Sequence, residues 1–460
     1  MEALEQNLLH HPSCCPIVCN RSQMSCDLSS DDRSTQPASR DSRLVRALVP
    51  FLCDAGWGSP QMGPQWLNHE DIYANESASG QQLFRACLHS LLRPGKDTAL
   101  VLTPHTLDVR NVLEEICCAP FFVQFRKDEG PPAASQRELL EDLEWAYAAA
   151  EEAAGRSGGR CSALVLSTPC PMTGQVADCL VVGALLRWAA TKPGLHFVVD
   201  ETLGVGAFSD ARIQFDTCEE HDSDDELAAL QAAADLEASR EWGRHWGRGR
   251  GFVSASAMLA PGDDRAHIIG AVDHDSCSSA RGWDKCAAWL LSQNVSVQKK
   301  VASYLEAPSQ AGGSEDSFMS MLEAEEGEYI SRLCARNSVQ MRTRQELTRR
   351  LLHEAPIATG TSNGIITVHS MAGSYVLCDL RRFLDSDGTA WNSSPDFEQE
   401  LALFDELFEV HGVLLAPGAL FGASEPGWFR MNVAWDEDAL IDGIDRLSLA
   451  LRWRNGTGCG

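Results

Sequence analysis

The sequence predicts an α/β fold in which a mainly parallel sheet, flanked by helices, forms a large domain, followed by a smaller α+β domain. Apolar stretches alternate with amphipathic ones over roughly the first three hundred residues. These apolar stretches are continuous, which is typical of strands that helices cover on both faces. After Val295 the alternation gives way to long helical patterns and short strands with Gly turns.

The chain of 460 residues is long enough for two or three domains. Residues 1–42 are rich in Ser, Asp and Cys and lack periodicity, so we expect them to be disordered. We place the large domain at 43–310, with an acidic, Ala-rich surface insertion at about 215–248. The small domain then covers 311–460.

The large domain is expected to begin with a helix from Arg43 that ends near Gly56. The longest helix that follows has Leu139 and Leu143 on one face and is expected to end before Gly155. The predicted strands are 71–77, 98–104, 119–125, 162–169, 195–201, 251–257 and 267–272, and the predicted helices among them are 80–95, 107–118 and 135–155.

The remaining chain is predicted to contain long helices and short strands. A closing helix after Asp436 has Leu440, Ile444 and Leu447 on one face. The other predicted helices are 296–306 and 318–355, and the predicted strands lie within 364–380, 412–422 and 427–435.

Composition excludes several classes of protein. The net charge of -27 argues against binding nucleic acid, which needs a basic surface. No apolar run approaches the ~18 residues of a membrane helix, and the start resembles neither a secretory signal nor a transit peptide, so we expect a cytoplasmic protein. The 17 cysteines are expected to be reduced. The spacing of Cys14, Cys15, Cys19 and Cys26 fits no zinc pattern, and we expect no metal.

Ligands of parallel sheets bind at the carboxyl ends of the strands. Asp200 ends a predicted strand, and a buried carboxylate there needs a cationic partner. Ser254 and Arg265, with the amides at Ser79 where a helix opens, could form a phosphate cradle. Pyridoxal phosphate (PLP) needs both sites, because its ring nitrogen takes an Asp, and it also takes a Lys as a Schiff base.

Several segments resemble a known family in the expected order. They are "LNHEDIYANESASG", "LLRPGKDTALVLTPHT", "STPCPMTG", "VVDETLG", "SASAMLAPGDDRAHIIG" and "EPGWFRMNVAW". From Arg43 onward the chain resembles the fold-type I PLP-dependent aminotransferase (class I/II) superfamily, specifically its 1-aminocyclopropane-1-carboxylate (ACC) synthase branch.

The resemblance implies roles for individual residues. Ala78 and Ser79 would meet the cofactor phosphate, and Ser254 and Arg265 would complete that site. Asp200 would pair with the ring nitrogen. Finally, Arg430 would bind the substrate α-carboxylate, a task that suits its planar guanidinium.

The chain also departs from the family pattern. Ala257 stands at the position of the Schiff-base Lys. Cys170 replaces the Asn that meets the ring oxygen, and Leu203 replaces the Tyr of the "DEIY" motif. His105 or Thr106 stands where a Tyr stacks on the ring. The family's N-terminal arm, which reaches into the site of a dimer partner, is not recognisable.

None of the six lysines is predicted to follow a strand at the cofactor position, so PLP would bind non-covalently at best. They are Lys96, Lys127, Lys192, Lys285, Lys299 and Lys300, of which Lys285 is expected on a helix. Losing a general base alone costs about 10²–10⁴-fold in rate.

Three functions remain open at this point. The chain could be an active PLP-dependent transferase or lyase acting on an α-amino acid. Alternatively, it could be a catalytically impaired relative that binds an amino acid or a phosphate-bearing ligand and forms a homodimer, or a heterodimer with an active homologue. The third alternative is the product of a decayed or wrongly assembled gene. Because of Ala257, we favour the impaired relative.

Overall fold

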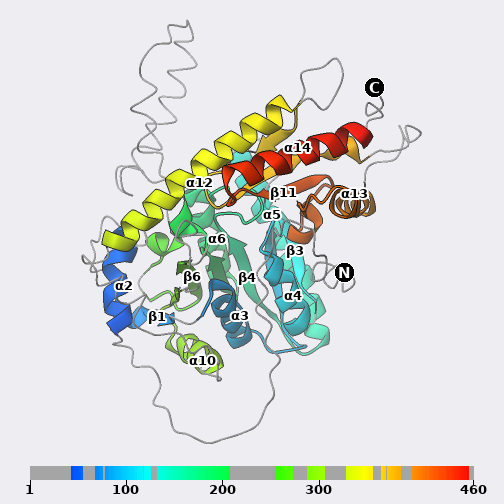
Figure 1. Ribbon diagram of the computed structural model, residues 1–460. Helices are drawn as coiled ribbons and strands as arrows, with labels where there is room; N and C mark the ends of the chain where they lie inside the picture. Colours follow the sequence, from blue (N-terminus) through cyan, green and yellow to red (C-terminus); the bar gives the residue numbers. More distant parts are fainter. Residues whose placement is uncertain are drawn as a thin grey trace, which may run out of the picture. The chain divides into compact units, whose positions relative to one another are not determined.

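Figure 1 shows the computed structural model of the chain, which consists of two compact units. The division falls between Arg342 and Thr343, and Met371–Gly373 belong to the first unit. The predictions for 1–42, for the insertion and for the boundary at 310 concern residues outside the described segments. Those segments are 43–54, 68–75, 78–117, 119–125, 132–207, 252, 254–260, 262–272, 287–305, 328–355, 364–368, 370–384 and 396–454.

The first unit contains a seven-stranded sheet in the order β1-β7-β6-β5-β4-β2-β3. Strands β2 to β6 pair in parallel, whereas β7 runs antiparallel to both β6 and β1. The prediction of a mainly parallel sheet is therefore confirmed, and the sheet has seven strands. The strands are β1 (Ile72–Asn75), β2 (Thr98–Thr103), β3 (Phe121–Gln124), β4 (Cys161–Ser167), β5 (His196–Asp200), β6 (Ala266–Val272) and β7 (Ala287–Leu291).

Helices cover both faces of this sheet, which explains its continuous apolar strands. One face packs against a core to which Leu48, Leu143 and Leu185 contribute. The other face packs against Leu83 and Val301. The first set of helices is α2 (Arg43–Asp54), α5 (Pro132–Arg156) and α6 (Cys179–Thr191), and the second is α3 (Gly80–Leu91), α4 (Leu107–Ile116) and α10 (Val295–Leu305).

Three local predictions were wrong or incomplete. The described residues of the predicted strand 251–257, which are 252 and 254–257, form no strand, because the Ser254 side chain accepts from the Ser256 amide and a 3-10 helix, η5 (Ala255–Met258), follows. Helix α6 and strand β7 were not predicted. Helix α5 runs through Gly155, and the chain leaves it at Gly158, whose φ is +67°.

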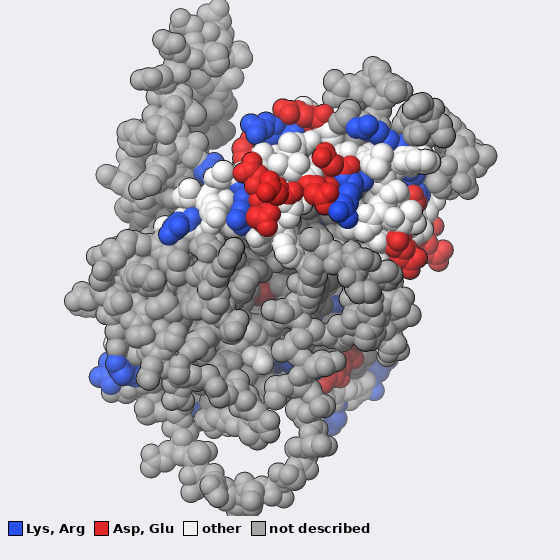
Figure 2. Space-filling view, in the orientation of Figure 1, with Lys and Arg blue, Asp and Glu red and all other residues white. Residues whose placement is uncertain are grey.

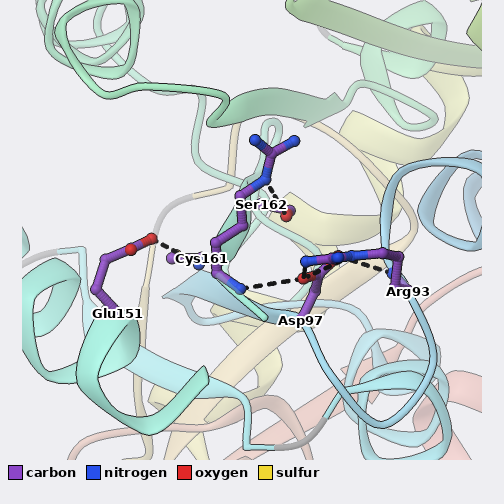
Figure 3. Close-up of polar contacts among 6 residues, drawn as sticks. Arg93, Asp97, Glu151, Cys161 and Ser162 are labelled. Atoms are coloured by element: carbon purple, nitrogen blue, oxygen red, sulfur yellow. Dashed lines mark hydrogen bonds and ion pairs between the residues drawn. The ribbon is translucent and has the colours of Figure 1, made fainter. Parts of the chain in front are cut away.

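A polar cluster fixes the amino edge of the sheet, where β2 and β4 begin (Figure 3). The buried Asp97 carboxylate accepts hydrogen bonds from the Arg93 guanidinium at 2.7 Å and from the Arg160 amide at 3.1 Å. Burial opposes ionisation of Asp97, but these hydrogen bonds outweigh it and lower the pKa. Beside them, Glu151 accepts from the Cys161 amide at 2.7 Å.

The second unit is built on a four-stranded antiparallel sheet, as predicted for a smaller α+β domain. Its core includes Leu352, Phe404 and Leu447. Helix α13 was not predicted. The elements are β8 (Ile366–Val368), β9 (Tyr375–Asp379), β10 (Ala416–Pro417), β11 (Trp428–Asn432), α13 (Phe397–Glu409), α14 (Glu437–Arg454) and the C-terminal part of α12 (Glu328–Glu354).

Charges of both signs alternate on the face of the second unit that α12 and α14 form (Figure 2). Arg446 pairs with Asp442 at 2.8 Å, and Arg349 pairs with Glu346 at 3.1 Å. This drawn face therefore has no extended basic surface. Within the described part of the chain, no helix combines the length and apolar character needed to cross a membrane.

Candidate functional site

The candidate site lies at the carboxyl edge of the parallel strands, on the face that α3 covers. Ser167 and Asp200 end the neighbouring strands β4 and β5 and are paired in register. Val198 packs in the core on the α3 face. Because side chains alternate along a strand, Asp200 points to that same face.

Asp200 is 5% exposed, and hydroxyl groups surround its carboxylate. The hydroxyl and the amide of Thr202 both donate to Asp200 Oδ1, at 2.7 and 3.1 Å. Ser167 Oγ lies 3.4 Å from Oδ2. This arrangement presents a carboxylate of fixed orientation, suited to a cationic N–H group of a ligand.

The first residue of α3, Gly80, packs against Thr202, whose hydroxyl bonds to this carboxylate. Ser79 and Gln82 form a capping box, in which Ser79 Oγ accepts from the Gln82 amide at 3.2 Å and Gln82 Oε1 accepts from the Ser79 amide at 2.9 Å. The amides of Gly80 and Gln81 belong to the first turn of α3, where the helix itself provides no acceptor. Buried Ala78 leads into this helix end, which carries partial positive charge and suits an anion.

His105 and Cys170 follow β2 and β4, and both therefore leave the sheet at the same edge. His105 is fully buried, its Nδ1 lies 2.8 Å from the Thr106 carbonyl, and its Nε2 has no partner among the described residues. Burial lowers the His105 pKa to about 4, so the ring is neutral at pH 7. Cys170 is half-buried in a turn closed by backbone bonds to Gln175 and Gly174.

Ser254 and Ala257 lie at the end of β5, on the face of the sheet opposite to the one that α3 covers. Glu201, whose side chain points away from the α3 face by strand alternation, accepts from the Ala255 amide at 2.6 Å and bonds to the Ser254 side chain. Ser254 Oγ also lies 2.8 Å from Ser256 Oγ. The structure therefore does not bring Ser254 to the N-terminus of α3, and Ala257 sits buried in η5 rather than after a strand.

Glu201 is a residue that the sequence reasoning missed. It is fully buried, its Oε2 has no partner among the described residues, and burial raises its pKa to about 8. The signal was a second carboxyl directly after the strand-end Asp200. Its hydrogen bonds hold η5 against the end of β5.

Arg265 requires a correction, because it stands at the amino edge of the sheet. It directly precedes β6, and its carbonyl accepts from the Phe197 amide at the start of β5. Its guanidinium donates to the carbonyls of Lys192 and Ala190, at 2.9 and 2.8 Å. Arg265 thus caps the C-terminus of α6 and is not brought together with Ser79 and Asp200.

Arg430 lies in β11 of the second unit, between two aromatic rings. Its guanidinium carbon is 3.9 Å from the centre of the Tyr375 ring and 4.3 Å from that of Phe421. Contacts with both rings restrict the positions that the guanidinium can take.

The four described lysines all lie away from the carboxyl edge. Lys96 precedes β2, and Lys192 precedes β5 and pairs with Glu144 at 2.6 Å. Lys299 and Lys300 are on α10, and Lys300 donates to the Ser90 carbonyl near the C-terminus of α3. Lys127 and Lys285 lie outside the described residues, so the expectation of a helix at Lys285 does too.

No family model matches the sequence. A stretch of 85 residues is 39% identical to 1-aminocyclopropane-1-carboxylate synthase-like protein 1 of Arabidopsis thaliana, covering 18% of this chain and 16% of that protein. A stretch of 316 residues is 23% identical to 1-aminocyclopropane-1-carboxylate synthase 2 of the same plant, covering 67% and 50%. The matched stretches thus span at most half of these two relatives.

A solved structure covers more of the chain. A mutant aspartate aminotransferase of Thermus thermophilus aligns over 90% of this chain and 84% of its own, with a TM-score of 0.59 and 18% identity. At this identity the likeness establishes the fold.

Proposed function

We propose that this chain, which has the fold of the fold-type I aminotransferases and resembles ACC synthase-like proteins, binds PLP non-covalently at the carboxyl edge of its sheet. The observation that carries the proposal is the meeting of two groups at one edge. These are the N-terminus of α3 at Ser79 and the buried carboxylate of Asp200.

The residues present fit the two ends of this cofactor. The amides of Gly80 and Gln81 suit the phosphate, and the fixed carboxylate of Asp200 would keep a proton on the ring nitrogen. When bound, PLP supplies an electron sink for negative charge at the substrate α-carbon. His105, neutral and buried at the same edge, would contact the ring.

The proposed substrate class is an α-amino acid, and Arg430 would bind its carboxylate. Tyr375 and Phe421 orient the guanidinium, so a bidentate contact would cost little side-chain entropy. Replacing Arg430 with Lys would remove the planar guanidinium, which can donate two parallel hydrogen bonds, but would keep the positive charge. We expect this variant to weaken the binding of α-amino acids in the presence of PLP by about tenfold, measured by calorimetry.

We also propose that the catalytic chemistry is impaired. The resemblance implies the Schiff-base position for Ala257, which offers neither an amine for covalent capture nor a base for the α-proton, but Ala257 lies in η5, away from Asp200. The proposal therefore depends on the lysines, because the four described ones all lie away from the carboxyl edge. Cys170 and Leu203 replace two further family residues. The chain would then act in the cytosol as a homodimer, or as the dimer partner of an active homologue.

A titration followed by chemical trapping tests these proposals. PLP should raise the melting temperature of the purified protein, and borohydride should then fix no cofactor on any lysine. If PLP leaves the melting temperature unchanged, the binding proposal is wrong. A stoichiometric adduct on Lys127 or Lys285, located by peptide mapping, would instead overturn the proposal of non-covalent binding and favour the active transferase or lyase. The partner proposal fails if sizing chromatography finds a monomer that ignores active homologues.

A further inference from the structure

We propose that Thr202 is a positioning residue that joins the two halves of the site, by orienting the Asp200 carboxylate and by packing against the N-terminus of α3. This inference rests on the proposed function, because it assigns a role toward the same ligand. It concerns a residue for which neither the sequence patterns nor the family resemblance suggested a task.

The first half of the argument is the hydrogen bonding of Thr202. Its hydroxyl and its amide reach the same oxygen, Oδ1 of Asp200, at 2.7 and 3.1 Å. Two donors from different directions fix the rotation of the carboxyl group. Oδ1 therefore accepts both hydrogen bonds from Thr202. The orientation of Oδ2, which lies 3.4 Å from Ser167 Oγ, is fixed as a result. In the "DEIY" motif an Ile, which has no hydroxyl, stands at this position.

The second half is the packing of the Thr202 methyl group. It lies against Gly80, the first residue of α3, so closely that a Cβ at Gly80 would overlap it. The same Cβ would lie 3.1 Å from the Cβ of Ala271 on β6. The small Gly80 therefore lets the helix end approach the strand exits, and the methyl group sets the distance between the helix amides and Asp200.

Two substitutions separate these contributions. Thr202→Val keeps the methyl packing and loses the hydroxyl, whereas Thr202→Ser keeps the hydroxyl and loses the methyl. Equilibrium dialysis would measure the affinity of each for PLP, for its 1-deaza analogue, which lacks the ring nitrogen, and for inorganic phosphate.

We expect Thr202→Val to weaken PLP binding by about tenfold and to leave the analogue and phosphate unchanged, because only the recognition of the ring nitrogen depends on the hydroxyl. We expect Thr202→Ser to preserve the preference for PLP over the analogue but to weaken all three ligands a few-fold. A general loss of packing would not produce this split.

The outcomes distinguish this inference from the proposed function. If Asp200→Asn abolishes the preference for PLP over the analogue but Thr202→Val retains it, the positioning role is overturned and the proposed function stands. If the wild-type protein does not bind PLP, the proposed function fails. A crystal structure of Thr202→Val then decides the positioning role, which is supported by a rotated Asp200 carboxylate and refuted by an unchanged one.

Discussion

Asp200 and Arg265 stand at opposite edges of the parallel sheet. In the register of β5 and β6, Phe197 pairs with Ala266 and Asp200 pairs with Ile269. Arg265 is therefore about four residues from Asp200 along the strands, which is roughly 13 Å. Its guanidinium is also committed to the carbonyls that end α6.

This separation predicts different effects for two alanine substitutions. Asp200→Ala should abolish the rise in melting temperature that PLP produces. Arg265→Ala should lower the stability of the unliganded protein by about 1 kcal/mol, because the C-terminus of α6 loses its cation, but should leave the PLP-induced rise intact. Thermal melts with and without PLP measure both effects. If PLP no longer raises the melting temperature of Arg265→Ala, Arg265 does contribute to the binding site.

The close approach of Gly80 and Thr202 predicts opposite signs for two Gly→Ala substitutions in helices. Gly80→Ala should destabilise the protein by about 1–3 kcal/mol and weaken phosphate binding, because its Cβ would displace α3 from the strand exits. Gly443→Ala on α14, where a Cβ meets nothing within 4 Å, should stabilise by about 0.5–1 kcal/mol. Urea unfolding measures both. A Gly80→Ala protein of wild-type stability would contradict the packing.

Buried Glu201 predicts a loss of stability as the pH rises. Its pKa is about 8 in the folded protein against 4.5 for an ordinary Glu. Between these values the unfolded chain has lost the proton that the folded protein keeps, so the unfolding free energy should fall by up to about 1.4 kcal/mol per pH unit. Glu201→Gln should remove this slope between pH 6.5 and 8. An exposed control, Glu138→Gln, should retain it, and equal slopes in all three proteins would refute the prediction.

A pair of histidines, of which His267 is fully buried, predicts the opposite trend in acid. His267 Nε2 lies 2.9 Å from His196 Nδ1, and His267 Nδ1 lies 2.8 Å from Ser292 Oγ. Burial lowers the His267 pKa to about 3. Below pH 6.5, His267 therefore binds a proton in the unfolded chain but not in the folded protein. The unfolding free energy should therefore fall with falling pH.

The matched variants for this trend are His267→Gln and the exposed His353→Gln. The first should be less stable than the wild type at pH 7 but lose less stability between pH 6.5 and 4.5, whereas the second should follow the wild type. Urea unfolding at intervals of half a pH unit gives the slopes. Parallel curves for His267→Gln and the wild type would show that His267 titrates normally.

Much of the fold could be predicted from the sequence, because local patterns encode it. The continuous apolar runs of β2, β4 and β5 indicate strands covered on both faces, and they predict the edge at which Asp200 emerges. The periodicity of α5 and α14 likewise indicates their buried faces. These signals lie within single segments, so no tertiary contact was needed to find them.

Only the tertiary structure decided how these segments combine at the site. The sequence places Ser254 and Arg265 close to each other along the chain, yet Ser254 bonds to Glu201 at the end of β5 and Arg265 caps α6 at the other edge. The parallel partner of β5 is β6 and not the segment at Ser254, because the Ser254 and Ser256 side chains favour a turn. Likewise, the contacts of Thr202 with Asp200 and Gly80 depend on the register of distant strands, which no local pattern in the sequence specifies.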